Sequence, residues 1–200
     1  MNESLKSRLN QIMDRMQSPE LLNNSGLGNE IGFYVFDYPP EEELTVREHV
    51  QFILDTLAKK KPDLKIVHVN LFQLLVDYLK ARDLFRKALN TEATKGKEAL
   101  LKLLKGPFHE EKIAKAFVEA AQPESCDVVI MTGVGNAWPL FRSHTLLSNL
   151  HPIMAGTPLV IFYPGVYDGQ TLSLFGRLPN NYYRAFRLVP EKYEQAAYEA

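Results

Sequence analysis

The stretch CDVVIMTGVGNAWPLFRSHTLLSNL, residues 126–150, decides the class of fold. It begins with the apolar run Val128–Met131, which is typical of a fully buried strand. The run stops at Thr132-Gly133-Val134-Gly135 and continues in a helical pattern that carries Arg142 and His144. A buried strand that ends at a glycine turn and leads into a helix is the usual arrangement at an α/β site.

Other strand-like runs lie on both sides of this stretch, at residues 31–36, 65–71 and 159–163, and they alternate with helical patterns. Such alternation predicts a mostly parallel sheet with right-handed crossovers. The run at 159–163 is continuously apolar and is expected at the sheet centre, whereas 182–189 has arginines on both faces and suits an edge. We therefore expect an α/β fold with a mostly parallel sheet of about five strands flanked by helices, like a P-loop protein without its phosphate loop.

The whole chain, 1–200, is expected to form one α/β domain, because a chain of this length buries a sufficient core. Residues 1–18 predict an N-terminal amphipathic helix, and a homodimer through residues 3–17 would cover its apolar face. The region between the second and third strands is too long for a single crossover helix, so residues 85–121 predict a helical insertion. Residues 166–181 are expected to form a long polar connection.

Composition excludes several classes of function. The net charge is −1, whereas a general nucleic-acid binder has a basic domain or stripe, so direct nucleic-acid binding is not expected. The single cysteine, Cys126, rules out an intramolecular disulfide and a cysteine-rich zinc site. Without a signal-peptide core or an apolar run of about 20 residues, the chain is expected to be cytoplasmic, with no membrane partner.

Three strand exits are marked by glycine, proline and aspartate: Asp37–Pro40, Thr132–Asn136 and Pro164–Gly169. In a parallel sheet these exits share the carboxyl edge, where ligands bind. The residues expected at this ligand or partner edge are Asp37, Tyr38, Gly133, Gly135, Arg142, His144, Asp168 and Gly169.

Complete catalytic motifs do not occur. Gly96-Lys97 is followed by glutamate and follows no strand, and Trp138 occupies the third glycine position of a dinucleotide fingerprint, so no cofactor is expected. Ser143 and His144 are adjacent, hence about 100° apart on a helix, and cannot act as nucleophile and base. No metal site and no catalytic residue are assigned.

Asp37 and Asp168 leave two interpretations open. Two carboxylates at this edge suit a metal or acid–base site. Together with Arg142, which could bind a phosphate or carboxylate, they give the alternative that the chain is a degenerate nucleotide- or metal-binding enzyme or sensor. They are equally ordinary turn and cap residues.

Aromatic and arginine residues are dense in the segment 163–187, which is typical of a protein interface. A stacking surface for single-stranded nucleic acid is the alternative, and would make the chain a DNA-contacting subunit. The residues expected at a partner interface are Tyr167, Phe175, Arg177, Tyr182, Tyr183 and Arg184.

The chain resembles the BrxB proteins of the bacteriophage-exclusion (BREX) systems. Three blocks carry the resemblance: Gly28–Pro40 with Arg47-Glu48-His49, Thr132–Leu147, and Phe162–Phe186. The resemblance implies an antiviral role beside an alkaline-phosphatase-superfamily protein, a large ATPase and a DNA methyltransferase. It implies no catalytic residue, and we expect a non-enzymatic assembly subunit that binds the phosphatase-like protein and supports host DNA methylation and phage restriction.

Overall fold

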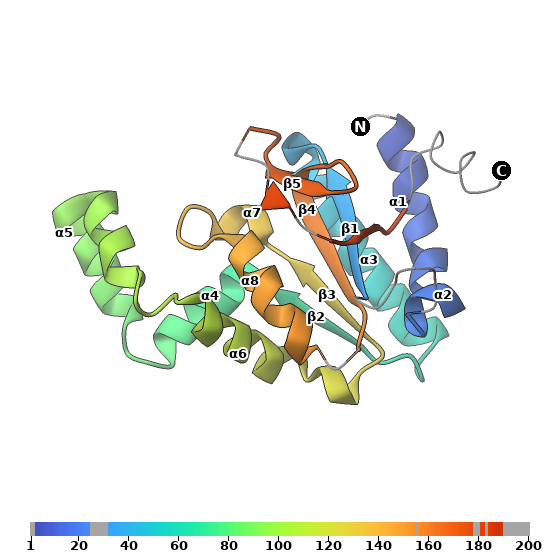
Figure 1. The fold of residues 1–200 in the computed structure, drawn as a ribbon, viewed down its shortest axis with the longest axis horizontal. Helices are drawn as coiled ribbons and strands as arrows, with labels where there is room; N and C mark the ends of the chain where they lie inside the picture. The colour runs from blue at the N-terminus through green and yellow to red at the C-terminus, as the bar shows by residue number, and fades with distance from the viewer. Residues whose placement is uncertain (1–2, 25–31, 155, 178–180, 183, 190–200) are drawn as a thin grey trace.

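A sheet with parallel strands lies between two layers of helices (Figure 1). The computed structural model describes residues 3–24, 32–154, 156–177, 181–182 and 184–189, and only the backbone of 143, 144, 181 and 182. Within these residues the parallel strands have the order β2-β3-β4-β1-β7. They are β1 (Phe33–Tyr38), β2 (Ile66–Asn70), β3 (Val128–Thr132), β4 (Leu159–Tyr167) and β7 (Phe186–Arg187). The predicted α/β class and the central fourth strand are thus confirmed. The edge strand expected over 182–189 is confined to Phe186–Arg187, because Tyr182 belongs to a separate strand.

One face of the sheet is covered by helices from the first third of the chain: α1 (Glu3–Met16), α2 (Pro19–Leu22) and α3 (Glu43–Lys60). Alternate residues of β1, such as Tyr34 and Phe36, point into this layer and belong to one apolar cluster with Ile12 of α1 and Ile53 of α3. The alternation follows from the two-residue repeat of a strand.

The opposite face is covered by α4 (Leu71–Lys80), α6 (Glu110–Ala121), the short α7 (Val134–Ala137) and α8 (Ser143–Leu150). Phe33 and Val35 of β1 point into this second cluster with Phe117 of α6 and Leu146 of α8. Short 3-10 helices η2 (Pro123–Ser125) and η3 (His151–Ile153) lead into β3 and away from α8. Both faces of the central strands β1, β3 and β4 are therefore buried, as expected for strands that read as continuous apolar runs.

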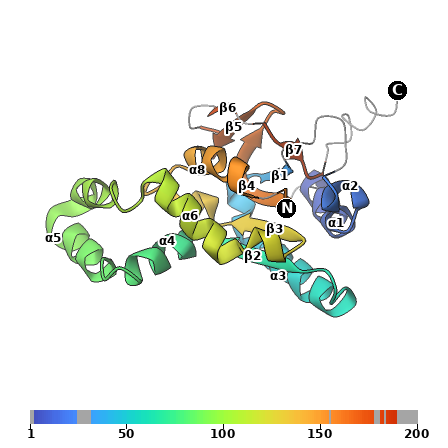
Figure 2. The same cartoon turned by 60° about the horizontal axis from the view of Figure 1, so that its bottom comes forward.

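α5 (Phe85–Leu104) projects from the body between α4 and α6 (Figures 1 and 2). Its two halves meet at Gly96, whose φ of +80° is not helical, and a Cβ at this position would meet no atom within 4 Å. The second half is anchored by Leu100 and Leu104, which belong to the core cluster. Of the predicted insertion, α6 lies against the sheet, whereas α5 forms an exposed arm.

The prediction that residues 166–181 form a long polar connection is wrong in part. β4 does not end at Pro164-Gly165 but continues to Tyr167, and β5 (Thr171–Leu174) pairs with its end as an antiparallel hairpin. β6 (Asn181–Tyr182) pairs with β5. Gly165 permits this pairing, since a Cβ there would lie 2.2 Å from the carbonyl oxygen of Ser173.

The apolar face of α1 is buried within the chain through Leu5, Leu9, Ile12 and Met16. A homodimer through residues 3–17 would therefore need α1 to leave the sheet. None of the helices in the described part of the chain is long and apolar enough to cross a membrane.

β1 leads into α3 without a glycine-rich loop. Pro39 is followed by the 3-10 helix η1 (Pro40–Glu42), which ends in Glu41 and Glu42. A phosphate-binding loop needs glycines, a lysine and free backbone N–H groups at this point. Two carboxylates and two prolines instead make this turn unsuitable for phosphate.

Candidate functional site

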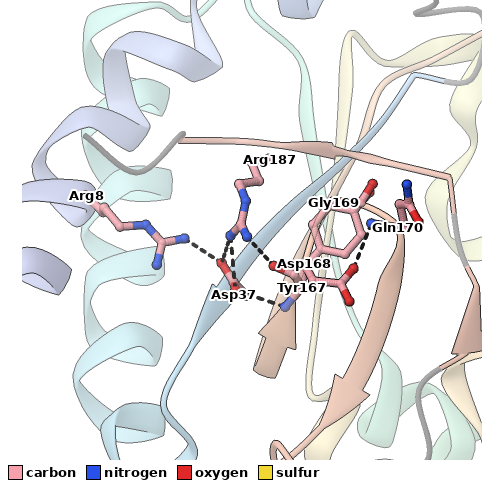
Figure 3. A network of polar contacts seen from close by, with 7 residues as sticks. All are labelled: Arg8, Asp37, Tyr167, Asp168, Gly169, Gln170 and Arg187. Atoms are coloured by element: carbon pink, nitrogen blue, oxygen red, sulfur yellow. Dashed lines mark hydrogen bonds and ion pairs between the residues drawn. The ribbon is translucent and has the colours of Figure 1, made fainter. Parts of the chain in front are cut away.

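The carboxylate of Asp37 is the centre of a buried polar network (Figure 3). Asp37 is the next-to-last residue of β1 and is 7% exposed. Its Oδ1 accepts a hydrogen bond from Nη2 of Arg8 at 2.6 Å, and its Oδ2 accepts one from the backbone N–H of Tyr167 at 3.0 Å. Nη1 of Arg187 lies 3.3 Å from both oxygens. Asp37 therefore serves as an internal ion-pair partner for two arginines.

Sequence reasoning missed both arginine partners, although Arg8 carried a signal. It lies on the apolar face of α1, between Leu5 and Ile12 at helical spacing. A charged residue at a core-facing position is buried only with a partner. The Arg8 guanidinium carbon also lies 4.7 Å from the ring centroid of Phe36, which adds a cation–π contact.

Tyr167 belongs to the core and not to an exposed partner interface. Its side chain is fully buried. The hydroxyl lies 2.6 Å from the carbonyl oxygen of Ala185 and 3.0 Å from that of Gly169. Nη2 of Arg187 also donates to the Tyr167 carbonyl oxygen. These contacts hold the end of β4 against the segment that leads into β7.

Asp168 and Gly169 form the turn of the β4–β5 hairpin (Figure 3). The Asp168 carboxylate accepts hydrogen bonds from the backbone N–H groups of Gln170 at 2.9 Å and Thr171 at 2.6 Å, and from the Thr171 hydroxyl at 2.6 Å. These bonds lower the pKa of Asp168 to about 2. The sequence left two interpretations open for Asp168, a site residue or a turn residue, and its hydrogen bonds in the hairpin are those of a turn residue.

Tyr38, Glu43 and Arg47 line one side of a cavity of about 390 Å³ between α3 and the ends of the strands. The Tyr38 hydroxyl donates to Glu43 at 2.6 Å, and Arg47 donates to the other Glu43 oxygen at 3.0 Å. Burial, followed by this hydrogen bond, raises the pKa of Tyr38 above its usual value. Tyr38 is therefore neutral, and its hydroxyl donates a hydrogen bond to the Glu43 carboxylate.

The opposite side of this cavity contains His68 and Thr132, from neighbouring strands. Nε2 of His68 lies 2.8 Å from the Thr132 hydroxyl oxygen. Desolvation lowers the pKa of His68, so the imidazole is neutral at pH 7. A hydroxyl beside a neutral imidazole resembles a nucleophile and base, but no group in the described residues hydrogen-bonds to Nδ1 of His68 as the third member of a triad does.

The turn after β3 needs glycine at positions 133 and 135, because neighbouring side chains leave no room for a Cβ atom. Gly133 has a φ of +71°, and a Cβ there would lie 2.3 Å from Oδ1 of Asn70, the N-cap of α4. A Cβ at Gly135 would lie 2.8 Å from Cγ of Pro164 and 3.1 Å from the ring of Phe175. The predicted convergence of the β3 exit with the β4 segment is thus present, and it is filled by side chains.

Trp138, Val166, Phe175 and Arg177 define a surface at the base of the hairpin, here called the hairpin surface. The Trp138 and Phe175 rings are edge to face at 6.0 Å, and Trp138 remains 40% exposed. Val166 is 52% exposed and Arg177 is exposed. A cleft of about 410 Å³ adjoins this surface, lined by Val166 and Phe175 together with Ser4, Leu5, Arg8, Asp37, Tyr38, Pro39, Pro40, Glu41, Gly165 and Gly176.

The remaining predicted residues lie elsewhere or outside the described part. Arg142 is exposed and lines a different groove, near α5 and α6. Arg184 is exposed beside β7. The side chains of His144 and Tyr182 and the whole of Tyr183 lie outside the described residues.

A metal ion has no donor set in the described residues. No group of three or more His, Cys, Asp or Glu side chains there is placed to hold a metal ion. Both cavities at the carboxyl edge combine apolar surface with several polar or charged side chains, which suits recognition of a side chain or small molecule.

Comparisons with known proteins agree on one family. The family model described as "BREX protein BrxB" matches residues 67–188. A protein named "BREX protein BrxB" from Escherichia coli O9:H4 (strain HS) is 47% identical over 188 residues, which cover 94% of this chain and 92% of the relative. One of the same name from Bacillus cereus (strain H3081.97) is 38% identical over 190 residues, which cover 92% and 97%. No solved structure matches the chain significantly.

Proposed function

The chain belongs to the BrxB family of BREX proteins, and we propose that within such a defence system it is a non-enzymatic assembly subunit. Its partner is the alkaline-phosphatase-superfamily protein of the system, with the ATPase and the DNA methyltransferase as further members of the complex. In this role it acts in the cytoplasm and supports host DNA methylation and restriction of phage.

The observation that carries the proposal is the hairpin surface. Trp138 and Val166 are apolar and exposed, and they flank the half-buried Phe175 beside the cleft of about 410 Å³. Aromatic residues and arginine are enriched at protein interfaces, and an aromatic anchor beside a pocket is the usual form of a hot spot. Arg177, at the end of the hairpin, adds a cation to this surface.

The surface is also held in place by its neighbours, which favours binding. Phe175 is held by the close approach of Gly135, and β4 and β5 are held by antiparallel pairing and by the Asp37 network. A preordered surface loses little entropy on association. By contrast, Asp37 and Asp168, the carboxylates of the enzyme alternative, are engaged in internal hydrogen bonds.

The test is co-purification from cells that express the complete defence system, with the tag on this chain. We expect Trp138→Ala and Arg177→Glu each to lower recovery of the phosphatase-like protein by about tenfold or more, the loss typical of a hot spot. Phe52→Ala and Lys59→Glu are the matched controls, because both residues are exposed on α3, away from the hairpin.

The controls should keep full recovery, and thermal melting should show that all four variants fold. Equal recovery for Trp138→Ala, Arg177→Glu and the native chain would remove the hairpin surface as the binding site. Failure of the native chain to recover the phosphatase-like protein would rule out this protein as the partner.

A further inference from the structure

The charge of this protein is distributed unevenly, although the net charge of the whole chain is only −1. Residues 80–105 contain eight Lys and Arg against three Asp and Glu, a net charge of +5. The rest of the chain contains fifteen Lys and Arg residues and twenty-one Asp and Glu residues, a net charge of −6. The basic segment coincides with the projecting α5 and its approach from α4, here called the arm (Figures 1 and 2).

The cations of the arm are free to bind an external anion. Six of them are exposed and form no ion pair with any described residue: Arg86, Lys87, Lys95, Lys97, Lys102 and Lys105. Basic side chains on an otherwise acidic surface repel one another unless they are screened or paired. Such an unneutralised cluster favours a polyanionic partner.

The groove at the base of the arm extends the same positive surface. It has a volume of about 680 Å³ and lies between the end of α5, the start of α6 and the start of α8. Lys105 of the arm lines it together with His109 and Arg142. Glu110 is the acidic residue of the lining. The arm and this groove are therefore continuous through Lys105.

The composition of the arm distinguishes among polyanions. Protein interfaces are depleted in lysine and enriched in aromatic residues, whereas the arm exposes lysines and its aromatic residue Phe85 is half-buried. Single-stranded nucleic acid is bound through exposed aromatic rings on which the bases stack. Lysines without stacking rings suit the phosphates of a duplex, which are contacted as point charges without reading the sequence.

We propose that the arm and the groove at its base bind the phosphate backbone of double-stranded DNA, without sequence preference. Arg142 contributes a bidentate phosphate contact in the groove, and the lysines of α5 contact phosphates beyond it. This proposal does not rest on the hairpin surface, since none of Trp138, Val166, Phe175 and Arg177 lines the groove. A net charge of −1 does not oppose such binding, since the charge near the bound phosphates is what matters.

The experiment measures binding of the full chain to a duplex of about 20 base pairs by fluorescence anisotropy, at several salt concentrations. The arm variant combines Lys95→Glu, Lys97→Glu and Lys102→Glu. The control variant combines Lys59→Glu, Lys60→Glu and Lys61→Glu, which makes the same change in net charge at an exposed lysine cluster at the end of α3. Thermal melting confirms that both variants are folded.

We expect the native chain to bind with an affinity that falls steeply with salt, since each phosphate contact contributes about 0.9 to the slope of log K against log salt concentration. The arm variant should lose affinity by about tenfold or more at low salt and lower the slope by about 3. The control should stay within about threefold of the native chain, as expected for a change in net charge alone.

Three outcomes would overturn the proposal. The first is no binding of duplex DNA by the native chain at low salt. The second is an equal loss in the arm and control variants, which would assign binding to net charge. The third is binding of single strands in preference to duplex DNA. Trp138→Ala should keep full DNA affinity, which separates this test from that of the assembly role.

Discussion

Nη2 of Arg8 lies 2.6 Å from Oδ1 of Asp37, and the two residues are 8% and 7% exposed. Arg8 belongs to the first helix and Asp37 to the first strand, while Arg187 reaches the same carboxylate from the last strand. One carboxylate at the carboxyl end of the sheet therefore joins the two ends of the described chain. Arg15 adds a hydrogen bond to the carbonyl oxygen of Leu188 at 3.1 Å.

Asp37→Asn should lower the free energy of unfolding by about 3 to 5 kcal/mol, because it leaves buried guanidinium groups without their counter-ion. Urea denaturation measures the change. The double variant Arg8→Met/Asp37→Asn lacks one of the cations that Asp37→Asn leaves unpaired. The double variant should therefore lose less free energy of unfolding than the sum of the losses in Arg8→Met and Asp37→Asn. Strictly additive losses would show that Arg8 and Asp37 are not energetically coupled.

Asp168→Asn should remove part of the acid sensitivity of the fold. The folded-state pKa of Asp168, about 2, lies below the ordinary value of 3.8. Its carboxylate therefore contributes stability that is present above pH 4 and is lost as the pH falls toward 2. The melting temperatures of the native chain and the variant should differ at pH 6 and converge near pH 2. The exposed Asp63→Asn is the control, and a pH-independent difference for Asp168→Asn would contradict the assignment.

Gly133→Ala should be more destabilising than Gly169→Ala, although both glycines have positive φ, +71° and +94°. A Cβ at Gly133 meets the Asn70 side chain at 2.3 Å, whereas a Cβ at Gly169 meets no atom within 4 Å. Overpacking adds about 1 to 3 kcal/mol to the backbone strain that both variants share. Chemical denaturation measures the difference, and equal losses would show that Asn70 moves aside freely.

His68 should titrate below its usual pKa of 6.5, as observed by NMR of the imidazole. The lowered folded-state pKa means that the unfolded chain binds the proton first, so this residue's contribution to stability is lost as the pH falls below 6.5. Since desolvation by the surrounding atoms is the cause, Thr132→Val should leave the midpoint below 6.5 despite removing the hydrogen bond. A midpoint at or above 6.5 in the native chain would contradict a desolvated, neutral imidazole.

Local patterns were sufficient for the main elements. The apolar runs at β3 and β4 and the helical spacing in α1 and α3 are properties of neighbouring residues, so their periods predict the elements directly. The prediction was wrong over residues 166–174, since Pro164 and Gly165 usually end a strand. Here Gly165 lets β5 approach its backbone, which depends on a partner strand that no local pattern contains.

The candidate site shows the same division. The sequence alone identified the α/β class, the carboxyl edge, the family resemblance, and Asp37, Gly133 and Gly135 as residues of that edge. Only the tertiary structure decided that Asp37 is neutralised by Arg8 and Arg187, and that the lysines of α5 stand together on a projecting arm. The reason is physical: a helix or strand is specified by short-range periodicity, whereas an ion pair between residues 8 and 37 and the charge of a surface depend on which distant segments the fold brings together.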